Sequence, residues 1–325
     1  MKAAIIGCGL IGKKRAAALP STVELAGCFD VVVASAESFA AEFNTKAYKS
    51  VAELLAIRDL NFVVIATRHD SLALLTIQAL AFEKNVFVEK PGAINEFEFL
   101  EVYELARRSN LKVHVGYNHR YHPALLQAYK FVLDGSIGDV MFLRARYGHG
   151  GRLGYEKEWR ADKSKSGGGE LIDQGTHLID LSISFLGKVE LDYAATPTYF
   201  WDMPVEDNAF ISLRSKQGKI AFLQASCTEW KNMFSLEVYG KIGKLDISGL
   251  GRSYGVETLT LHTMLPEMGP PVSETWTYPE PDKSWALEIG EFVDDLMTGS
   301  NNSDNLDSSL GVLRVISEIY RRTNR

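Results

Sequence analysis

The sequence predicts an α/β protein with a parallel sheet crossed by helices, followed by an open, mostly antiparallel sheet. In residues 1–120, short β-branched runs alternate with helical stretches, which is typical of a parallel sheet with crossover helices. From residue 121 onward, apolar residues recur with a period of two, which indicates antiparallel strands. We therefore expect two domains, 1–120 and 121–325, with no flexible linker between them.

The first domain is expected to alternate strands with helices. Strands are predicted at 2–6, 23–29, 62–66, 86–88 and 112–115, and helices at 10–19, 35–43, 50–57, 71–82 and 95–109. Ser50 with Glu53, and Asn95 with Glu98, have the spacing of helix-capping pairs. The second domain is expected to contain strands at 140–147, 189–196, 209–214, 220–228, 234–239 and 244–247, and helices at 123–133, 169–186, 284–298 and 308–322.

Composition excludes several classes of protein. The 325 residues are 46% hydrophobic and 23% charged, with a net charge of −6, so an extended basic surface for nucleic acid is not expected. No apolar run is long enough for a transmembrane helix, and the N-terminus does not have the pattern of a signal peptide. The three cysteines, Cys8, Cys28 and Cys227, form no CxxC pair, which favours reduced thiols in a cytoplasmic protein.

A glycine motif lies between the first strand and the first helix. Gly7, Gly9 and Gly12 form a GxGxxG pattern, which permits a tight turn, a close approach of pyrophosphate and close helix–strand packing. Asp30 ends the second strand, where its carboxylate can accept hydrogen bonds from the adenosine ribose and would repel a 2′-phosphate. Val31 follows, with no Arg immediately beside it, so we expect NAD rather than NADP.

Lys90 lies in a Glu89-Lys90-Pro91-Gly92 run at the end of a predicted strand. Ligands of open α/β sheets bind beyond the carboxyl ends of the strands, so Lys90 is a candidate to contact a substrate oxygen. On its own, the same lysine would be an ordinary surface charge. The sequence leaves open whether Pro91 follows a cis peptide bond.

Asp173 and His177 follow a glycine-rich stretch and are four residues apart on a predicted helix, so both should project from one side. This spacing suits a carboxylate that orients an imidazole, two groups that address one hydroxyl, or two metal ligands. An ordinary surface pair would have the same spacing. No third ligand follows at an obvious spacing, so we expect no metal.

Together these motifs resemble the Gfo/Idh/MocA oxidoreductases, the family of glucose–fructose oxidoreductase and inositol dehydrogenase. The resemblance rests on Gly7-x-Gly9-x-x-Gly12, Asp30, Val63–Thr67, Glu89-Lys90-Pro91, Tyr117–Arg120 and Gly168-Gly169-x-x-x-Asp173-x-Gly175-x-His177, which occur in order along the chain. It implies a Rossmann domain, then an α/β domain whose open sheet forms a homodimer or homotetramer. It also implies that Lys90, Asp173 and His177 are the catalytic residues.

The resemblance also implies binding residues. Cofactor contacts are expected from Gly7, Gly9, Leu10, Ile11, Gly12, Asp30, Thr67, Arg68, Glu89 and Lys90. Two departures from the family pattern affect this region. Thr67-Arg68-His69-Asp70-Ser71-Leu72 stands where relatives carry Thr-Pro-x-x-x-His, and Gly92 stands where Leu or Met is frequent.

Substrate contacts are expected from Tyr117, Asn118, Arg120, Arg160, Asp173 and His177. The neighbouring His119 and His122 are three residues apart, a spacing that two metal ligands can have. We expect instead that both are partly buried polar side chains. The basic and aromatic stretch from Arg144 to Lys165 suits an anionic or nucleotide-linked sugar, or else arginines on solvated strand faces. Trp201, Trp230 and Trp276 remain unassigned.

We therefore hypothesise an NAD-dependent oxidoreductase that transfers hydride between nicotinamide and a secondary hydroxyl of a sugar, polyol or nucleotide sugar. One alternative is an NAD-dependent glycoside hydrolase of the same fold, with no net redox change. Another is a non-catalytic NAD-binding regulator. The expected partner is a small carbohydrate, with no nucleic acid and no membrane.

Overall fold

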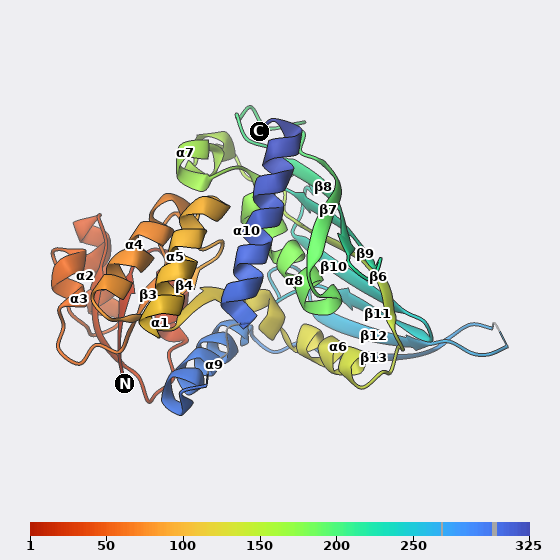
Figure 1. The fold of residues 1–325 in the computed structure, drawn as a ribbon, viewed down its shortest axis with the longest axis horizontal. Helices are drawn as coiled ribbons and strands as arrows, with labels where there is room; N and C mark the ends of the chain where they lie inside the picture. The colour runs from red at the N-terminus through yellow and green to blue at the C-terminus, as the bar shows by residue number, and fades with distance from the viewer. Residues whose placement is uncertain (268, 301–303) are drawn as a thin grey trace. The chain divides into compact units, whose positions relative to one another are not determined.

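The chain divides into two compact units in a computed structural model that describes residues 1–267, 269–300 and 304–325 (Figure 1). Unit 1 comprises Met1–Tyr117 and Trp285–Leu310, and unit 2 comprises Asn118–Ser284 and Gly311–Arg325. The first change of unit therefore falls close to the expected boundary at residue 120. The expected second domain of 121–325 differs from the structure, because residues 285–310 cluster with unit 1.

The sheet of unit 1 is parallel and has five strands in the order β2-β1-β3-β4-β5. The strands are β1 (Lys2–Ile6), β2 (Glu24–Phe29), β3 (Phe62–Ile65), β4 (Asn85–Glu89) and β5 (Val113–Gly116). A single parallel bridge between Cys28 and Ala47 places one more extended residue outside β2. Counting that residue as a rudimentary strand gives the Rossmann order, whose topological switch point lies between β1 and β3.

The helices of unit 1 begin at the expected signals. They are α1 (Leu10–Ala17), α2 (Val33–Glu42), α3 (Val51–Leu55), α4 (His69–Ala81) and α5 (Glu96–Ser109). The Ser50 side chain accepts a hydrogen bond from the Glu53 N–H, and the Asn95 side chain accepts from the N–H groups of Phe97 and Glu98. Both predicted caps are therefore confirmed.

A C-terminal helix, α9 (Ser284–Thr298), completes the core of unit 1. Ile289, Phe292 and Val293 are buried in the same cluster as apolar residues of the sheet. The Phe292 ring meets those of Phe62 and Phe87 edge to face, with centroids 5.4 and 5.6 Å apart. This packing explains why a segment so late in the chain belongs with the first unit. Helix α9 is followed in the sequence by α10 (Asp304–Thr323), which continues into unit 2 at Gly311.

The sheet of unit 2 has eight strands in the order β13-β12-β11-β10-β6-β9-β8-β7. The strands are β6 (Val140–Gly148), β7 (Val189–Ala195), β8 (Asn208–Ser215), β9 (Ile220–Ser226), β10 (Met233–Gly240), β11 (Gly243–Ser248), β12 (Glu257–Thr263) and β13 (Val272–Tyr278). Within the part of the chain that the structure describes, β6–β9 is the one parallel pair of this sheet, so the expected mostly antiparallel sheet is confirmed. Strands β12 and β13 were not predicted.

Helices cover one face of this sheet (Figure 1). They include α6 (Pro123–Leu133), which packs on β11–β13, and α8 (Thr176–Leu186), which packs on β6, β7 and β9. Short helical turns occur at η1 (Asn118–Tyr121), η2 (Tyr155–Lys157), η3 (Trp159–Ala161) and α7 (Lys163–Ser166). The expected helix over 169–186 begins instead as a π-helical turn, η4 (Leu171–Gly175). Among the described residues, no helix is both long and apolar enough to cross a membrane.

Candidate active site

The glycine loop after β1 is shaped for close approach. Gly7 has a φ of +99°, and a Cβ there would lie 2.4 Å from the Ala66 carbonyl oxygen. A Cβ at Gly12 would lie 1.9 Å from the Gly7 carbonyl oxygen, so both positions need glycine. A Cβ at Gly9 would instead meet nothing within 4 Å. This open side of the loop precedes α1, whose N-terminus has no side-chain cap, and such an N-terminus attracts phosphate.

Asp30 lies beside this loop, at the end of β2. Its Oδ2 accepts a hydrogen bond from the Cys8 N–H at 2.8 Å, and its Oδ1 accepts from the Val32 N–H at 2.8 Å. The carboxylate is therefore fixed next to the glycine turn, and the exposed Val31 beside it brings no positive charge. The loop, the uncapped helix start and this carboxylate fit a dinucleotide with two free ribose hydroxyls.

The loop after β3 contains the departure from the family pattern. Arg68 is the N-cap residue of α4, and its guanidinium pairs with Asp70 at 3.0 Å. The Thr67 hydroxyl accepts a hydrogen bond from the Ser71 hydroxyl at 2.8 Å. Arg68 is half exposed and stabilises the start of its own helix, while its expected contact with a cofactor stays a prediction.

Glu89 ends β4 in a buried ionic cluster that the sequence did not indicate. Its carboxylate accepts from the fully buried Arg15 at 2.6 Å, and Arg15 also pairs with Glu288 of α9 at 2.7 Å. Burial raises the pKa of Glu89, and Arg15 offsets this only partly. Burial also favours the neutral form of Glu288, but Arg15 and His114 outweigh it and lower the pKa of Glu288. Glu89 thus anchors the strand end from inside rather than facing solvent.

Lys90 follows Glu89 directly and is partly buried. The Lys90–Pro91 peptide bond is cis, which answers the question left open by the sequence. Of the three expected catalytic residues, Lys90 belongs to unit 1, and Asp173 and His177 belong to unit 2.

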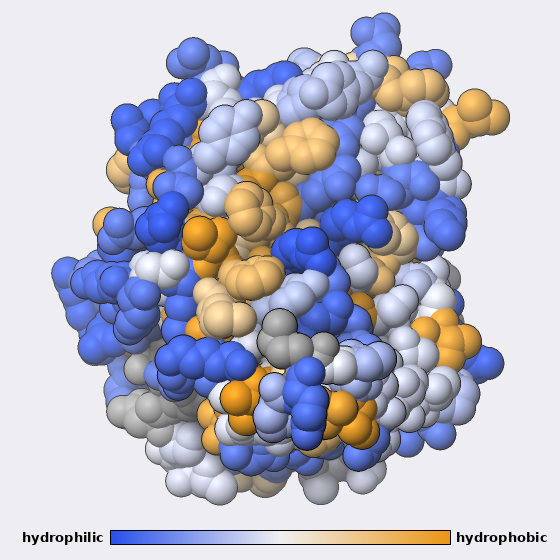
Figure 2. All heavy atoms as spheres, turned by 90° about the vertical axis from the view of Figure 1, so that its right-hand side faces the viewer, coloured by the Kyte–Doolittle hydropathy of each residue, from blue (hydrophilic) through white to orange (hydrophobic). Residues whose placement is uncertain are grey.

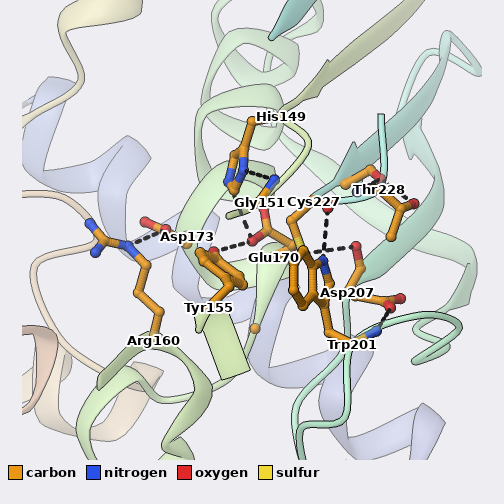
Figure 3. Close-up of polar contacts among 12 residues, drawn as sticks. His149, Gly151, Tyr155, Arg160, Glu170, Asp173, Trp201, Asp207, Cys227 and Thr228 are labelled. Carbon is orange, nitrogen blue, oxygen red and sulfur yellow. Dashed lines mark hydrogen bonds and ion pairs between the residues drawn. The ribbon is translucent and has the colours of Figure 1, made fainter. Parts of the chain in front are cut away.

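Asp173 lies in the π-helical turn η4, and π-helical turns are frequent at functional sites. Its Oδ2 accepts a hydrogen bond from Nε of Arg160, on η3, at 2.9 Å (Figure 3). Arg160 and Asp173, both expected to contact the substrate, are therefore hydrogen-bonded to each other. The Asp173 side chain is nearly buried, whereas that of Arg160 is 33% exposed.

Glu170, one turn before Asp173, is the centre of a buried polar cluster (Figure 3). The Tyr155 hydroxyl donates to Glu170 Oε1 at 2.7 Å, and His149 Nε2 lies 3.7 Å from the same oxygen. Burial, with the nearby charge of Asp173, raises the pKa of Glu170 to about 8. Burial lowers the pKa of His149, whose Nδ1 accepts from the Gly151 N–H at 2.9 Å. Near neutral pH this cluster therefore holds an uncharged carboxyl group behind the carboxylate of Asp173.

His177 is buried at the start of α8 and contacts other aromatic rings. The ring of His119 meets it edge to face, with centroids 3.7 Å apart, and the Tyr147 ring lies 5.9 Å away. His119 and His122 are both buried, and His122 Nδ1 lies 3.0 Å from the Glu257 carboxylate. These two histidines are the buried polar residues that we expected, and His119 also packs against the candidate base.

The remaining expected substrate residues are differently engaged. Tyr117 is fully buried in unit 1. Asn118 Nδ2 donates to the Ser284 hydroxyl at 2.9 Å, within unit 2. Arg120 Nε donates to the fully buried Asp180 at 2.7 Å, so its guanidinium ties η1 to α8. That pairing gives Arg120 a structural role, and its expected contact with the substrate stays a prediction.

The basic stretch from Arg144 to Lys165 does not converge on one site. Arg144 and Arg146 are exposed, whereas Tyr147 on the opposite face of β6 is buried. Arg144 pairs with Glu237 at 2.8 Å, and Lys165 pairs with Asp162. The second interpretation, arginines on a solvated strand face, therefore describes Arg144 and Arg146. Arg160 is the member of the stretch that reaches Asp173.

Several residues in and around the candidate site belong to no sequence motif. Glu170 precedes Asp173 by three residues, which was the one available signal, but no pattern connects it with Tyr155 or His149. The pairing of Arg15 with Glu288 joins residues 273 positions apart and leaves no local signal.

Among the described residues, no three His, Cys, Asp or Glu side chains are grouped so that they could hold a metal ion.

Unit 1 has a parallel sheet with the glycine loop and Asp30, and unit 2 has an open, mostly antiparallel sheet. These features define a dinucleotide-binding α/β protein of two units. The chain belongs to the Gfo/Idh/MocA oxidoreductase family. Residues 1–117 match the family's NAD-binding Rossmann fold, and residues 125–246 match its C-terminal domain. Unit 1 thus contains an NAD-binding Rossmann domain.

Individual relatives are distant. Glucose-6-phosphate 3-dehydrogenase of Bacillus subtilis strain 168 is 30% identical over 184 residues, which are 55% of this chain and 52% of that protein. Levoglucosan dehydrogenase of Pseudarthrobacter phenanthrenivorans is 27% identical over 58% of this chain and 48% of that protein. The matches span about half the length of these curated relatives. The crystal structure of a putative NADPH-dependent oxidoreductase from Desulfitobacterium hafniense shares the fold, with a TM-score of 0.90 and 20% identity over 100% of this chain and 96% of that one.

Proposed function

We propose that the protein is an NAD-dependent oxidoreductase that oxidises a secondary hydroxyl of a sugar, polyol or nucleotide sugar. The observation that carries this proposal is the arrangement around η4, where Arg160 holds the carboxylate of Asp173 four residues before the buried His177. Two relatives, each matched along about half of its length, are named as dehydrogenases of sugars or sugar derivatives, which supports the substrate class.

The proposed mechanism gives each residue one task. When bound, NAD supplies the acceptor for the hydride that leaves the substrate carbon. His177 accepts the proton of the hydroxyl group as general base. Asp173, which pairs with Arg160, stabilises the imidazolium that forms, while Lys90 donates a hydrogen bond to the substrate oxygen and stabilises its alkoxide character. The hydroxyl group thereby becomes a carbonyl group.

Lys90, Asp173 and His177 are thus the proposed catalytic residues. Cofactor binding is assigned to Gly7, Gly9, Leu10, Ile11, Gly12 and Asp30, with Thr67, Arg68, Glu89 and Lys90 as further contacts. NAD is proposed over NADP because the fixed carboxylate of Asp30 would repel a 2′-phosphate. Among the expected substrate contacts, Arg160 retains the strongest support, since it pairs with Asp173 and is still partly exposed.

The test is NADH absorbance with purified protein, NAD and a panel of sugars, polyols, sugar acids and nucleotide sugars. We expect one class to be oxidised, and we expect His177→Ala and Lys90→Ala each to lower kcat/KM by roughly 10²–10⁴-fold. Circular dichroism checks that the variants fold. A His177→Ala variant with unchanged turnover would refute the assigned base.

We also propose that copies associate through the open face of the unit 2 sheet, as a homodimer or homotetramer in the cytoplasm. Figure 2 shows apolar side chains gathered near the centre of that face, among polar ones. Phe222 of β9 is 54% exposed there, next to the exposed Arg144 of β6. The three cysteines are buried and free, which suits a reducing compartment. Light scattering should report a smaller assembly for Phe222→Glu, and an unchanged mass would contradict this interface.

A further inference from the structure

The π-helical turn η4, which carries Asp173, begins without a local side-chain cap. The first N–H groups of a helix have no partner within it, and the side chain of Glu170, the residue before η4, does not cap them. Glu206 accepts from three consecutive N–H groups at this start. Those of Gly169 and Leu171 donate to Glu206 Oε1, at 2.9 and 3.1 Å. That of Glu170 donates to the Glu206 carbonyl oxygen at 3.0 Å. A residue distant in the sequence therefore caps this turn.

Tyr320 of α10 contacts the same carboxylate oxygen. Its hydroxyl group donates to Glu206 Oε1 at 2.7 Å, and both residues are buried in unit 2. A Cβ at Gly168 would lie 1.8 Å from the Tyr320 hydroxyl oxygen, and a Cβ at Gly169 would lie 2.0 Å from the Glu206 carbonyl oxygen. The two glycines before η4 are therefore required for this close contact. We call Glu206 and Tyr320 the clamp.

The segment that carries Glu206 is held at further points. The guanidinium of Arg325, which follows α10, donates to the Pro204 carbonyl oxygen at 3.3 Å and to the Thr198 hydroxyl at 3.0 Å. Asp207, the residue after Glu206, is fully buried. Its carboxylate accepts hydrogen bonds at 2.7–3.1 Å from the N–H groups of Tyr199, Phe200 and Trp201. The clamp therefore fixes η4 to a segment that is itself immobilised.

The form of η4 decides where the candidate groups point. The hydrogen bonds of a π-helical turn run from residue i to i+5, so the residues after it project in other directions than they would after an α-helical turn. Asp173 lies inside η4, and His177 is the second residue of α8, which follows directly. The directions of both side chains therefore depend on whether η4 keeps its π-helical form.

The clamp acts on the backbone of η4 and not on the reacting groups. The contacts of Glu206 described above are to N–H groups and to Tyr320, whereas the carboxylate of Asp173 accepts from Arg160 at 2.9 Å (Figure 3). Because both clamp residues are buried, an effect of either one on turnover must pass through the position of η4. Misplacement of catalytic groups by about 1 Å can cost roughly 100-fold in rate.

We propose that Glu206 and Tyr320 are positioning residues, which hold η4 as a π-helical turn and so place Asp173 and His177 for proton transfer. The inference rests on the proposed function and adds to it two residues that belong to no sequence motif. It gives the last helix of the chain a part in the reaction, through one hydroxyl group.

The kinetic test uses Tyr320→Phe, which removes this hydroxyl group and retains the buried ring. With the sugar that the protein oxidises, we expect kcat to fall roughly 10- to 100-fold and KM to change less than about threefold, since Asp173 and His177 are present but displaced. Glu206→Ala should act in the same direction, whereas Glu206→Gln retains an acceptor oxygen and should retain most of kcat. Tyr239→Phe is the matched control, because it removes a hydrogen-bonded hydroxyl group elsewhere in unit 2 and should change neither constant.

A second readout needs no turnover. In protein with 15N-labelled histidines, the imidazole resonances of His177 are assigned by their loss in His177→Ala. These resonances should shift in Tyr320→Phe and in Glu206→Ala, because the start of α8 moves with η4. The resonances of His262, on β12, should stay in place and serve as the internal control.

The two readouts let the positioning role and the proposed function fail separately. Shifted His177 resonances in a protein that oxidises no sugar would retain the clamp and refute the oxidoreductase activity. Full kcat with unshifted resonances in Tyr320→Phe and Glu206→Ala would overturn the clamp. So would a lowered urea midpoint with unchanged kcat, which would leave these residues a purely structural role, or a loss in Glu206→Gln as large as that in Glu206→Ala.

Discussion

Glu170 shows how one buried carboxyl group couples stability to pH. Its pKa is raised from 4.5 to about 8, chiefly by burial and then by the charge of Asp173. A folded-state pKa above the unfolded value means that the folded protein holds the proton more tightly. Its contribution to stability is thus fully present below about pH 4.5 and is lost as the pH rises through about 8.

Glu170→Gln should remove this dependence, because the amide is neutral at every pH. In urea titrations from pH 5 to 8, we expect the unchanged protein to lose up to roughly 1.4 kcal/mol of unfolding free energy per pH unit relative to the variant. Glu190→Gln, at an exposed position of β7, is the control. Parallel pH profiles for Glu170→Gln and the unchanged protein would contradict the neutral carboxyl group.

Asp30 is the residue that we expect to select NAD over NADP. Asp30→Asn keeps one oxygen, which can accept from either the Cys8 or the Val32 N–H group, and removes the negative charge. The variant should therefore bind NADP more tightly relative to NAD, by roughly tenfold or more, because a like-charge repulsion is gone. Calorimetric titration of both dinucleotides measures the ratio without turnover. An unchanged ratio would mean that Asp30 does not select the cofactor.

At the scale of elements, α9 joins unit 1 through both its apolar face and Glu288. Glu288→Ala should leave Arg15 with one carboxylate partner in a fully buried site. Breaking a buried ion pair on one side typically costs about 3–5 kcal/mol, so the urea midpoint should fall markedly. Glu291→Ala, at an exposed position one turn along α9, should stay within about 0.5 kcal/mol. Equal losses in the two variants would argue against the ionic cluster.

The elements that sequence predicted well have local signals. Ser50 and Asn95 cap their helices as expected, since capping depends on residues three positions apart. The sequence predicts ordinary α-helix at η4, because the apolar pattern there fits an α-helix and a π-helical turn equally. The sequence analysis does not predict β12 and β13. In β12, Thr258-Leu259-Thr260-Leu261 does alternate with a period of two, but its neighbour β13 is mostly exposed and polar and has no apolar pattern.

At the scale of the whole molecule, the glycine motif and the change of period predicted both sheets and the start of unit 2. The return of residues 285–310 to unit 1 could not be predicted, because the apolar face of α9 does not indicate which sheet it covers. The sequence indicates those candidate residues that lie within motifs of neighbouring residues. Contacts across the chain, such as Tyr155 with Glu170 or Arg160 with Asp173, depend on folding and have no sequence pattern.

Direct hydride transfer is the central claim, and isotope transfer tests it most directly. The protein is incubated with NAD and sugars deuterated at carbon, from monosaccharides to disaccharides, and the nicotinamide product is analysed by mass spectrometry. The account predicts NADH that carries one deuterium, with formation abolished or greatly slowed in His177→Ala. NADH without deuterium, or glycoside cleavage with no NADH at all, would contradict it.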